Sequence, residues 1–420
     1  MTTIYRGAAV HDGTGAPPAH RDLVITGGRV APAGHTDQGA RVVDVSGRDI
    51  IPGLIDCHTH VALPHLDAHR LMNTPLSHRF LATGRTLART LDLGITTVRD
   101  AGGADAGIAM AVADGLVRGP RVRTAIAMIS PTGGHADPWR LSGTAARWLF
   151  PLYPGMPDPV ADGPTGLRRV VRELVRAGAD VIKVAVSGGI SSPRDDPRHC
   201  QLRQDELTAL VEEAGAAGLR VMAHAHGPAA ITAAVRAGAA SIEHGVFADE
   251  EGIALMAEHG TFLVPTLTAA RAFLAVAEAG AAAEPGLLVQ AREAVAVHET
   301  TLRRAMEAGV RIAMGSDSGF SPHGGNLDEL EALAQAGLDR AQVLRSATSA
   351  AAELLGADHE IGTLRPGMRA DFSVVSGDPL DFATLAGRVE AVYQDGVLVG
   401  GTEFTGRNDN GNDKGNEDLA

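Results

Sequence analysis

Residues 50–60 read IIPGLIDCHTH, an apolar run that changes abruptly into the polar segment DCHTH. The apolar half has the length and composition of a buried strand, so the polar half follows where that strand ends. In an extended segment residues i and i+2 point the same way, and the imidazoles of His58 and His60 can therefore bind one ion. The stretch predicts a buried strand with a metal-binding histidine pair at its carboxyl end.

Seven further strand-like runs follow along the chain, separated by helical segments. The runs are GITTVRD (94–100), RVRTAIAM (121–128), DVIKVAV (180–186), LRVMAHA (219–225), ASIEHG (240–245), TFLVPT (261–266) and RIAMGSD (311–317). Helical segments such as 166–179 and 204–218 close with a glycine near the next strand. Eight strand–helix repeats predict an α/β fold, a (β/α)8 TIM barrel. A doubly wound sheet is the alternative, but no G-x-G-x-x-G follows the first strand.

Both ends of the chain show a different pattern, in which short strands alternate with turns. The strand–turn runs are IYRGAAV (4–10), DLVITGGRV (22–30), ARVVDVSGR (40–48), DFSVVSG (371–377) and VEAVYQDGVLVGG (389–401). We therefore expect residues 1–52 and 362–403 to form one discontinuous β-sandwich, with the barrel at 53–361. The polar stretch NDNGNDKGNEDLA (408–420) has no apolar residue to anchor it, and residues 404–420 are expected to be disordered.

Composition excludes several classes of protein. With 420 residues, 45% of them hydrophobic, the chain can bury a large core, and no apolar run approaches the ~20 residues of a spanning helix. A formal charge of -13 argues against a nucleic-acid or anionic membrane surface. Two cysteines and a start without an export signal fit a reducing compartment. The sequence predicts a cytoplasmic protein that acts on a small molecule.

Lysine is almost absent from the chain. Of 37 Lys and Arg residues only Lys183 and Lys414 are lysine, so the chain uses arginine nearly everywhere for a cation. Lys183 lies within the apolar run VIKVAV, where a lone ammonium would be costly. We expect its chemistry to be altered or its charge to be neutralised, and an ion pair with a buried acid such as Glu243 is the alternative.

Polar side chains recur at the ends of the predicted barrel strands, where function is located in this fold. They are His58, His60, Lys183, His224, His226, Glu243, His244 and Asp317. A single histidine is more often a core or surface residue, but several histidines, an aspartate and an unusual lysine at strand ends favour a metal site.

The motifs PGLIDCHTH (52–60), VIKVAVSGGISSP (181–193), MAHAHG (222–227), SIEHG (241–245) and GSDSG (315–319), in this order, resemble the amidohydrolase superfamily. The resemblance covers essentially the whole chain, including ADFSVVSGDPL (370–380). It extends to the imidazolonepropionase-related enzymes, but the strand-4 lysine resembles the binuclear branch. GGHAD (133–137) and SGGISSP (187–193) resemble the Xaa-Pro dipeptidase (prolidase)-like group.

The resemblance implies a metal centre with assigned ligands. His58, His60 and Asp317 would hold one cation, His224 and His244 a second, and Lys183, carboxylated on its amine, would bridge them. Carboxylation turns a buried cation into an anionic oxygen ligand. Zinc is the default metal for such nitrogen and oxygen ligands, and manganese or cobalt could replace it.

The same resemblance implies a mechanism in which a metal-bridging hydroxide attacks the scissile carbonyl. Asp317 would be the general base and pass the proton to the leaving nitrogen. His226 would meet the substrate or the oxyanion, or else be a rim histidine bonded to backbone. His135 would orient the substrate, and a turn-stabilising role is the alternative.

Loop residues complete the set of candidate substrate contacts. Only 3% of the chain is aromatic, yet Trp139, Trp148 and Tyr153 cluster after the third strand. Such a loop is typical of a lid or substrate wall, or of an interface in a homo-oligomer. Arg194 could pair with a substrate carboxylate or with its neighbours Asp195 and Asp196.

These features favour a metal-dependent hydrolase of a peptide or peptide-like amide bond, in a dipeptide or an N-acyl amino acid. A hydrolase of a cyclic amide, lactone or carbamate in secondary metabolism could use the same site, because loops set the substrate. A non-catalytic barrel is the third reading, and the complete set of ligands argues against it.

Overall fold

A computed structural model describes residues 2–147, 149–192, 194–278, 285–404 and 406–408. The chain divides into two compact units. The first comprises residues 1–55, 91–96 and 340–420, and the second comprises residues 56–90 and 97–339. Among the described residues, no helix has the length and apolar character that crossing a membrane requires.

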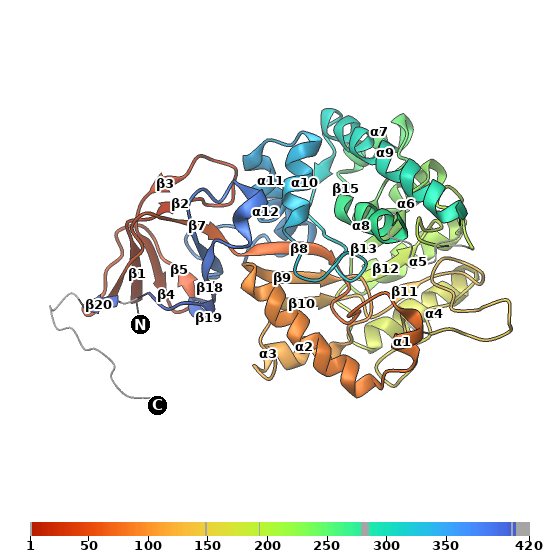
Figure 1. The fold of residues 1–420 in the computed structure, drawn as a ribbon, viewed down its shortest axis with the longest axis horizontal. Coiled ribbons are helices and arrows are strands. Elements are labelled where there is room, and N and C mark those ends of the chain that lie inside the picture. Colours follow the sequence, from red (N-terminus) through yellow and green to blue (C-terminus); the bar gives the residue numbers. More distant parts are fainter. Residues whose placement is uncertain (1, 148, 193, 279–284, 405, 409–420) are drawn as a thin grey trace. The chain divides into compact units, whose positions relative to one another are not determined.

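The first unit contains two sheets built from both ends of the chain (Figure 1). One has the order β20 (Gly406–Asn408), β6 (Arg41–Asp44), β1 (Thr2–Arg6), β4 (Leu23–Thr26) and β5 (Arg29–Val30). The other has the order β19 (Val397–Gly401), β18 (Val389–Gln394), β17 (Phe372–Ser376), β7 (Arg48–Pro52), β2 (Ala9–Val10) and β3 (Ala19–His20). Its helices are α11 (Arg340–Ser346), α12 (Ser349–Leu354) and α13 (Phe382–Leu385).

The two sheets share one hydrophobic core. Tyr5 of the first sheet lies edge-on to Phe372 of the second, with ring centroids 5.0 Å apart, and Phe372 stacks on Tyr393 at 4.4 Å. Segments far apart in sequence are thus joined by burial of apolar side chains, which is the main favourable term in folding.

Two details differ from the expected boundaries. The first unit includes residues 53–55, 91–96 and 340–361, the last of these with α11 and α12, all of which we assigned to the barrel segment 53–361. Residues 406–408, expected within a disordered tail, form β20 and pair antiparallel with β6. Backbone hydrogen bonding to the edge strand needs no apolar side chain, so hydrophobic patterning could not reveal it. The rest of the tail, 405 and 409–420, lies outside the described residues.

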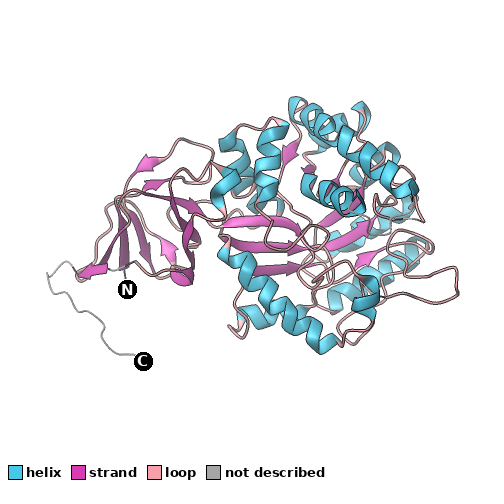
Figure 2. Cartoon of the chain, in the orientation of Figure 1, coloured by secondary structure: helices cyan, strands magenta, loops and turns pink. Residues whose placement is uncertain are grey.

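The second unit is a ring of strands surrounded by helices, as Figure 2 shows by colour. The strands are β8 (Leu54–Thr59), β9 (Ile95–Asp100), β10 (Arg121–Thr124), β11 (Met128–Ile129), β12 (Ile182–Ala185), β13 (Val221–Ala225), β14 (Ser241–His244), β15 (Phe262–Val264) and β16 (Arg311–Ile312). The helices are α1 (Ala68–Met72), α2 (Leu76–Asp92), α3 (Ala106–Ala113), α4 (Gly163–Arg176), α5 (Gln204–Ala216), α6 (Pro228–Ala237), α7 (Glu250–His259), α8 (Leu267–Glu278), α9 (Pro285–Glu307) and α10 (Asp328–Ala336).

Hydrogen bonds between neighbouring strands establish the strand order around the barrel. Strands β8, β9 and β10 are neighbours, and β11 to β16 follow as consecutive parallel neighbours. The amide of Cys57 in β8 donates to Met314 O at 2.9 Å, and the amide of Asp317 donates to His58 O at 2.7 Å. Residues after β16 therefore return to β8, in the order expected of an α/β barrel, and the doubly wound alternative is wrong.

The third strand position is divided into β10 and β11. The two strands are separated by residues 125–127, where Ile126 has a φ of 64°. A β-branched residue in the left-handed region is unfavourable, so the surrounding structure must hold it. The carbonyl of Ile126 accepts from Gly103 N at 2.8 Å, and its amide donates to Thr124 Oγ1 at 2.8 Å.

Candidate metal centre and active site

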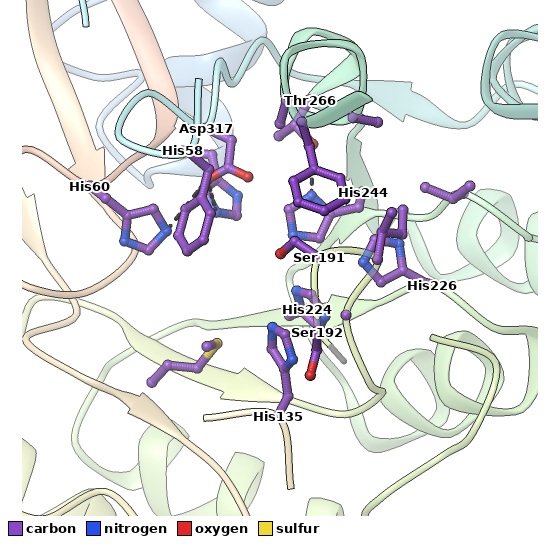
Figure 3. A pocket seen from close by; sticks show the side chains of 18 of the residues that line it. His58, His60, His135, Ser191, Ser192, His224, His226, His244, Thr266 and Asp317 are labelled. Carbon is purple, nitrogen blue, oxygen red and sulfur yellow. Dashed lines mark hydrogen bonds and ion pairs between the residues drawn. The ribbon is translucent and has the colours of Figure 1, made fainter. Parts of the chain in front are cut away.

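A cavity of ≈ 430 Å³ opens at the carboxyl ends of the barrel strands. Its polar lining comes from β8, β12, β13 and β14, from the segments that follow β8, β11, β12, β13, β15 and β16, and from α9; Figure 3 shows the labelled side chains among them. The cavity contains every metal ligand expected from the sequence: His58, His60, Lys183, His224, His244 and Asp317. Residues up to 259 positions apart in sequence converge here because parallel strands end at one rim of the barrel.

The two histidines of the β8 motif are each held through one ring nitrogen. His58 Nδ1 lies 2.6 Å from Glu243 Oε2, and His60 Nδ1 lies 2.8 Å from the carbonyl oxygen of Gly102. A carbonyl or an ionised carboxylate can only accept, so Nδ1 of each ring carries the proton. The Nε2 atoms of His58 and His60 are therefore unprotonated and carry the lone pairs that metal ligands require.

Asp317 lies opposite these two nitrogen atoms. Its Oδ1 is 3.5 Å from His58 Nε2 and 3.4 Å from His60 Nε2, and it has no hydrogen-bond partner among the described residues. Burial lowers the pKa of His60 well below its ordinary value, so that ring is neutral. A buried carboxylate oxygen without a hydrogen-bond partner, close to the unprotonated nitrogens of two imidazoles, gives a set of donor atoms that suits a cation.

A second group of donors comes from β13 and β14. Ligand atoms of His224, His226 and His244 all lie within 4.8 Å of one another. His224 Nε2 is 3.1 Å from Gly188 O, and His244 Nδ1 is 2.7 Å from Thr266 Oγ1. Burial lowers the pKa of all three imidazoles well below the usual value, and neutral imidazole is the ligand form.

His226 is placed differently from the backbone-bonded rim histidine that was the alternative. Its Nδ1 is buried without a hydrogen-bond partner among the described residues, and its ring stacks on His244 with centroids 4.9 Å apart. The side chain lines the cavity. The Nδ1 atom of His226 is therefore available to a ligand, and its contact with a substrate stays a prediction.

Lys183 lines the same cavity and is only 1% exposed. Its Nζ is 3.4 Å from His58 Nε2. Burial lowers the pKa of Lys183 to about 8, although the charges of Glu243 and Asp317 oppose the shift. The ion pair of Lys183 with Glu243 is not what the described structure shows, because both oxygens of Glu243 are bonded to other groups.

Those groups include Arg99, which sequence reasoning missed. Arg99 Nη2 donates to Glu243 Oε1 at 3.0 Å, and Arg99 Nε donates to Cys57 O at 2.6 Å. The hydroxyl of Ser241 also donates to Oε1. Burial opposes ionisation of Glu243, but Arg99 and His58 hold its pKa at about 2. The only signal in the sequence was a charged residue within the apolar run GITTVRD (94–100).

His135 reaches the cavity from the loop after β11. Its ring stacks on His224 with centroids 4.5 Å apart, and its Nδ1 lies 3.1 Å from Asp195 Oδ2. Its amide donates to Gln201 Oε1 at 2.9 Å. The side chain lines the cavity while the backbone fixes the loop, so both expected roles are structurally compatible.

Arg194 binds two backbone carbonyl oxygens of the loop after β11. Its Nη1 donates to Trp139 O at 2.5 Å and its Nη2 to Asp137 O at 2.7 Å. Neither expected acidic neighbour binds its guanidinium: Asp195 bonds His135, and Asp196 accepts from the amide of Arg198. The alternative in which Arg194 pairs with Asp195 or Asp196 is wrong, because the loop turns their carboxylates toward other donors. Arg194 lines the cavity, and its pairing with a substrate carboxylate stays a prediction.

The aromatic residues do not form the expected substrate wall. Trp139 is 54% exposed at the base of a hairpin that pairs it with Ala145, and Tyr153 packs edge-on against Phe80. Neither lines the cavity, and Trp148 lies outside the described residues. The loop instead contributes Arg140 and Leu149. Composition located the loop, but side-chain direction depends on the hairpin register.

A family model described as "Amidohydrolase family" matches residues 50–404. The chain belongs to the amidohydrolase family. The expectation of a hydrolase that acts on carbon–nitrogen bonds is thereby confirmed, and so is the resemblance to prolidase-like proteins described next.

This amidohydrolase is similar to curated and solved relatives over nearly its whole length. Ochratoxinase from Aspergillus niger is 34% identical, with 97% of this chain and 87% of that protein covered. A solved prolidase complexed with N-methylphosphonate-L-proline is 34% identical, with a TM-score of 0.85 and 95% and 99% of the two chains covered. A Xaa-Pro dipeptidase with bound methionine is 30% identical, with a TM-score of 0.86 and the same coverage.

Proposed function

We propose that this amidohydrolase hydrolyses the amide bond of a dipeptide or an N-acyl amino acid with two bound divalent cations. The convergence of His58, His60, Lys183, His224, His244 and Asp317 on one cavity carries the proposal. Zinc is the metal we propose, with manganese or cobalt as possible replacements, since imidazole and carboxylate ligands suit all three.

The donor atoms suggest how the cations are shared. His58, His60 and Asp317 would hold one, because Asp317 Oδ1 lies within 3.5 Å of the Nε2 atom of each histidine. His224 and His244 would hold the other. Lys183 would bridge them as a carbamate: its neutral amine attacks carbon dioxide, a C–N bond forms, and one proton leaves to solvent. Burial favours the neutral amine that this reaction needs.

Bound divalent cations would supply Lewis acidity that activates a water molecule and polarises the amide carbonyl. Asp317 would accept a proton from the attacking water and return it to the leaving nitrogen, since its carboxylate is buried at the cavity wall. His226 and His135 project into the same space and would orient the substrate or donate to the developing oxyanion.

The remaining lining of the cavity indicates the character of the substrate. An apolar wall is formed by Met128, Ile190, Val246, Phe273 and Phe320. Arg140 adds a positive charge; burial and then the neighbouring Arg194 lower the pKa of its guanidinium. We propose a substrate with an apolar group on one side of the amide and a carboxylate on the other.

A substrate panel tests this function. Purified protein loaded with zinc or manganese is incubated with dipeptides, N-acyl amino acids, their C-terminal amides, and cyclic amides, lactones and carbamates. We expect release of the amino acid to be fastest for apolar compounds with a free carboxylate, and about 10- to 100-fold slower for the amides. Hydrolysis confined to the lactones or carbamates would contradict the amide assignment.

A substitution at Glu243 tests the metal assignment. Glu243→Gln removes the carboxylate that accepts from His58 Nδ1 and from Arg99. We expect zinc affinity, measured by competition with a chromophoric chelator, to fall about 10- to 100-fold, the usual effect of losing such a partner.

The control for that experiment is Glu251→Gln. Glu251 forms an exposed ion pair with Arg236 on the barrel exterior, and such pairs contribute little to stability. Zinc affinity of this variant should equal that of the unmodified protein. Equal affinity in Glu243→Gln as well would remove Glu243 from the proposed centre.

A further inference from the structure

Glu329, on α10, is a fully buried carboxylate that contacts neither the cavity nor the expected metal ligands. Its Oε1 accepts from Leu267 N at 2.8 Å. Its Oε2 accepts from the backbone amide and the hydroxyl of Thr268, each at 2.8 Å. Burial raises the pKa of Glu329 to about 7, and these three donors favour the ionised form. One carboxylate thus fixes the first turn of α8.

Thr266, the residue before that turn, contacts His244, one of the proposed metal ligands. Thr266 Oγ1 lies 2.7 Å from His244 Nδ1, and Figure 3 shows the two side chains joined by this contact. Thr266 has a φ of 54° and His244 a φ of 71°. Left-handed backbone is unfavourable for these residue types, for the β-branched threonine above all, and persists only where neighbours hold it. Glu329 accepts from the amide of Leu267, the residue after Thr266, and so fixes the backbone next to this left-handed residue.

A second path leads from Glu329 to the other proposed site. The Thr268 hydroxyl shares its one hydrogen between Glu329 Oε2 at 2.8 Å and, more weakly, the carbonyl oxygen of Ser316 at 3.3 Å, the residue before Asp317. Asp317 has a φ of 52°, again left-handed. In the turn before α10, Asn326 Nδ2 donates to Asp56 Oδ2 at 2.9 Å, and Asp56 Oδ2 accepts from the Ser316 hydroxyl at 2.6 Å. The start of α10 and the turn before it therefore connect the segments that follow β15 and β16 with Asp56 of β8.

We infer that Glu329 is a positioning residue of the metal centre, which orients His244 through Thr266 and Asp317 through Thr268 and Ser316. His244 and Asp317 belong to different proposed cations, so this one carboxylate would align ligands of both. The inference rests on the proposed function, because it presupposes that these side chains bind metal.

Two substitutions test the inference by metal affinity rather than by activity alone. Glu329→Gln keeps the size of the side chain but presents an amide to backbone donors. Thr268→Val removes the shared hydroxyl, and Thr268→Ser, the matched control, retains it. We expect cation affinity, measured by chelator competition below the unfolding temperature, to fall at least about 10-fold in Glu329→Gln and Thr268→Val. Thr268→Ser should stay within about 3-fold of the unmodified protein.

Steady-state kinetics give a second readout. For a positioning residue, kcat of Glu329→Gln should recover substantially at saturating cation, whereas KM for the substrate changes little. A lower midpoint of thermal unfolding with unchanged cation affinity would overturn the inference, because it would show a structural role only. If Glu329→Gln does not fold, the comparison of Thr268→Val with Thr268→Ser decides: equal affinities overturn the inference.

The two proposals fail in different ways. An unmodified protein that binds no cation after metal loading would refute the proposed function. An unmodified protein that binds two cations, with the same affinity in Glu329→Gln, would refute only the role of Glu329.

Discussion

Replacing Lys183 with methionine is expected to reduce kcat/KM roughly 1,000-fold, because Lewis-acid stabilisation by the metals amounts to several kcal/mol. Methionine fills a similar volume to lysine but cannot form a carbamate. Lys183 is 1% exposed and its Nζ lies 3.4 Å from His58 Nε2, so the substitution removes the proposed bridging group from among the metal ligands. We also expect fewer bound cations per chain by elemental analysis.

The near absence of lysine permits a direct spectroscopic test. Lys183 and Lys414 are the only lysines in the chain, and Lys414 lies outside the described residues. Protein prepared in ¹³C-bicarbonate should show one carbamate carbon signal, which disappears in Lys183→Met and persists in Lys414→Ala. A metallated, active Lys183→Met protein would contradict the proposal outright.

The pH dependence of carboxylation follows from the burial of Lys183. Only the neutral amine attacks carbon dioxide, and burial lowers the pKa of this amine to about 8. At a constant concentration of dissolved carbon dioxide, carboxylation of metal-free protein should therefore accelerate as pH rises toward 8, where the protonated fraction falls, and level off above it. An unperturbed lysine would continue to accelerate up to its ordinary pKa near ~10.4.

The proposed metal ligands could be located in the sequence because their signals are local. An apolar run indicates a strand, and the polar ligand types that follow it indicate where the strand ends. Examples are the two histidines at i and i+2 after residues 50–55 and the aspartate at the end of RIAMGSD (311–317). The barrel then brings strand ends together without further information. For this reason His58, His60, His224, His244 and Asp317 all line one cavity.

The supporting residues could not be predicted, because their roles depend on tertiary geometry. Arg99 reads as a charged residue within an apolar strand, and Glu329 as an ordinary acidic residue at a helix start. Their partners, Glu243 and the Leu267 and Thr268 amides, lie 144, 62 and 61 positions away. The expectation that Trp139 and Tyr153 line the cavity was wrong for a related reason. Loop conformation, and not composition, decides which side chains face a cavity.

Replacing Asp317 with asparagine is expected to lower kcat about 100- to 10,000-fold, the usual contribution of a positioned general base. Asparagine has nearly the shape of aspartate and tolerates the left-handed backbone that Asp317 adopts, with its φ of 52°. The backbone bond from residue 317 to His58 O does not involve the side chain and should remain. The variant is therefore expected to fold, so that lost activity reports on the carboxylate.

Asp317→Asn and Asp317→Ala together separate the roles of this residue. Asparagine retains one oxygen that can bind a cation, whereas alanine retains none, so cation affinity should fall further in Asp317→Ala.

If Asp317 is the base, the acidic limb of the pH–rate profile of the unmodified protein should vanish in Asp317→Asn even at saturating cation. An Asp317→Asn variant that keeps this limb and a kcat within 10-fold, about 1.4 kcal/mol in activation free energy, would exclude Asp317 as the base. Proton transfer would then fall to His226 or His135, the imidazoles that line the same cavity.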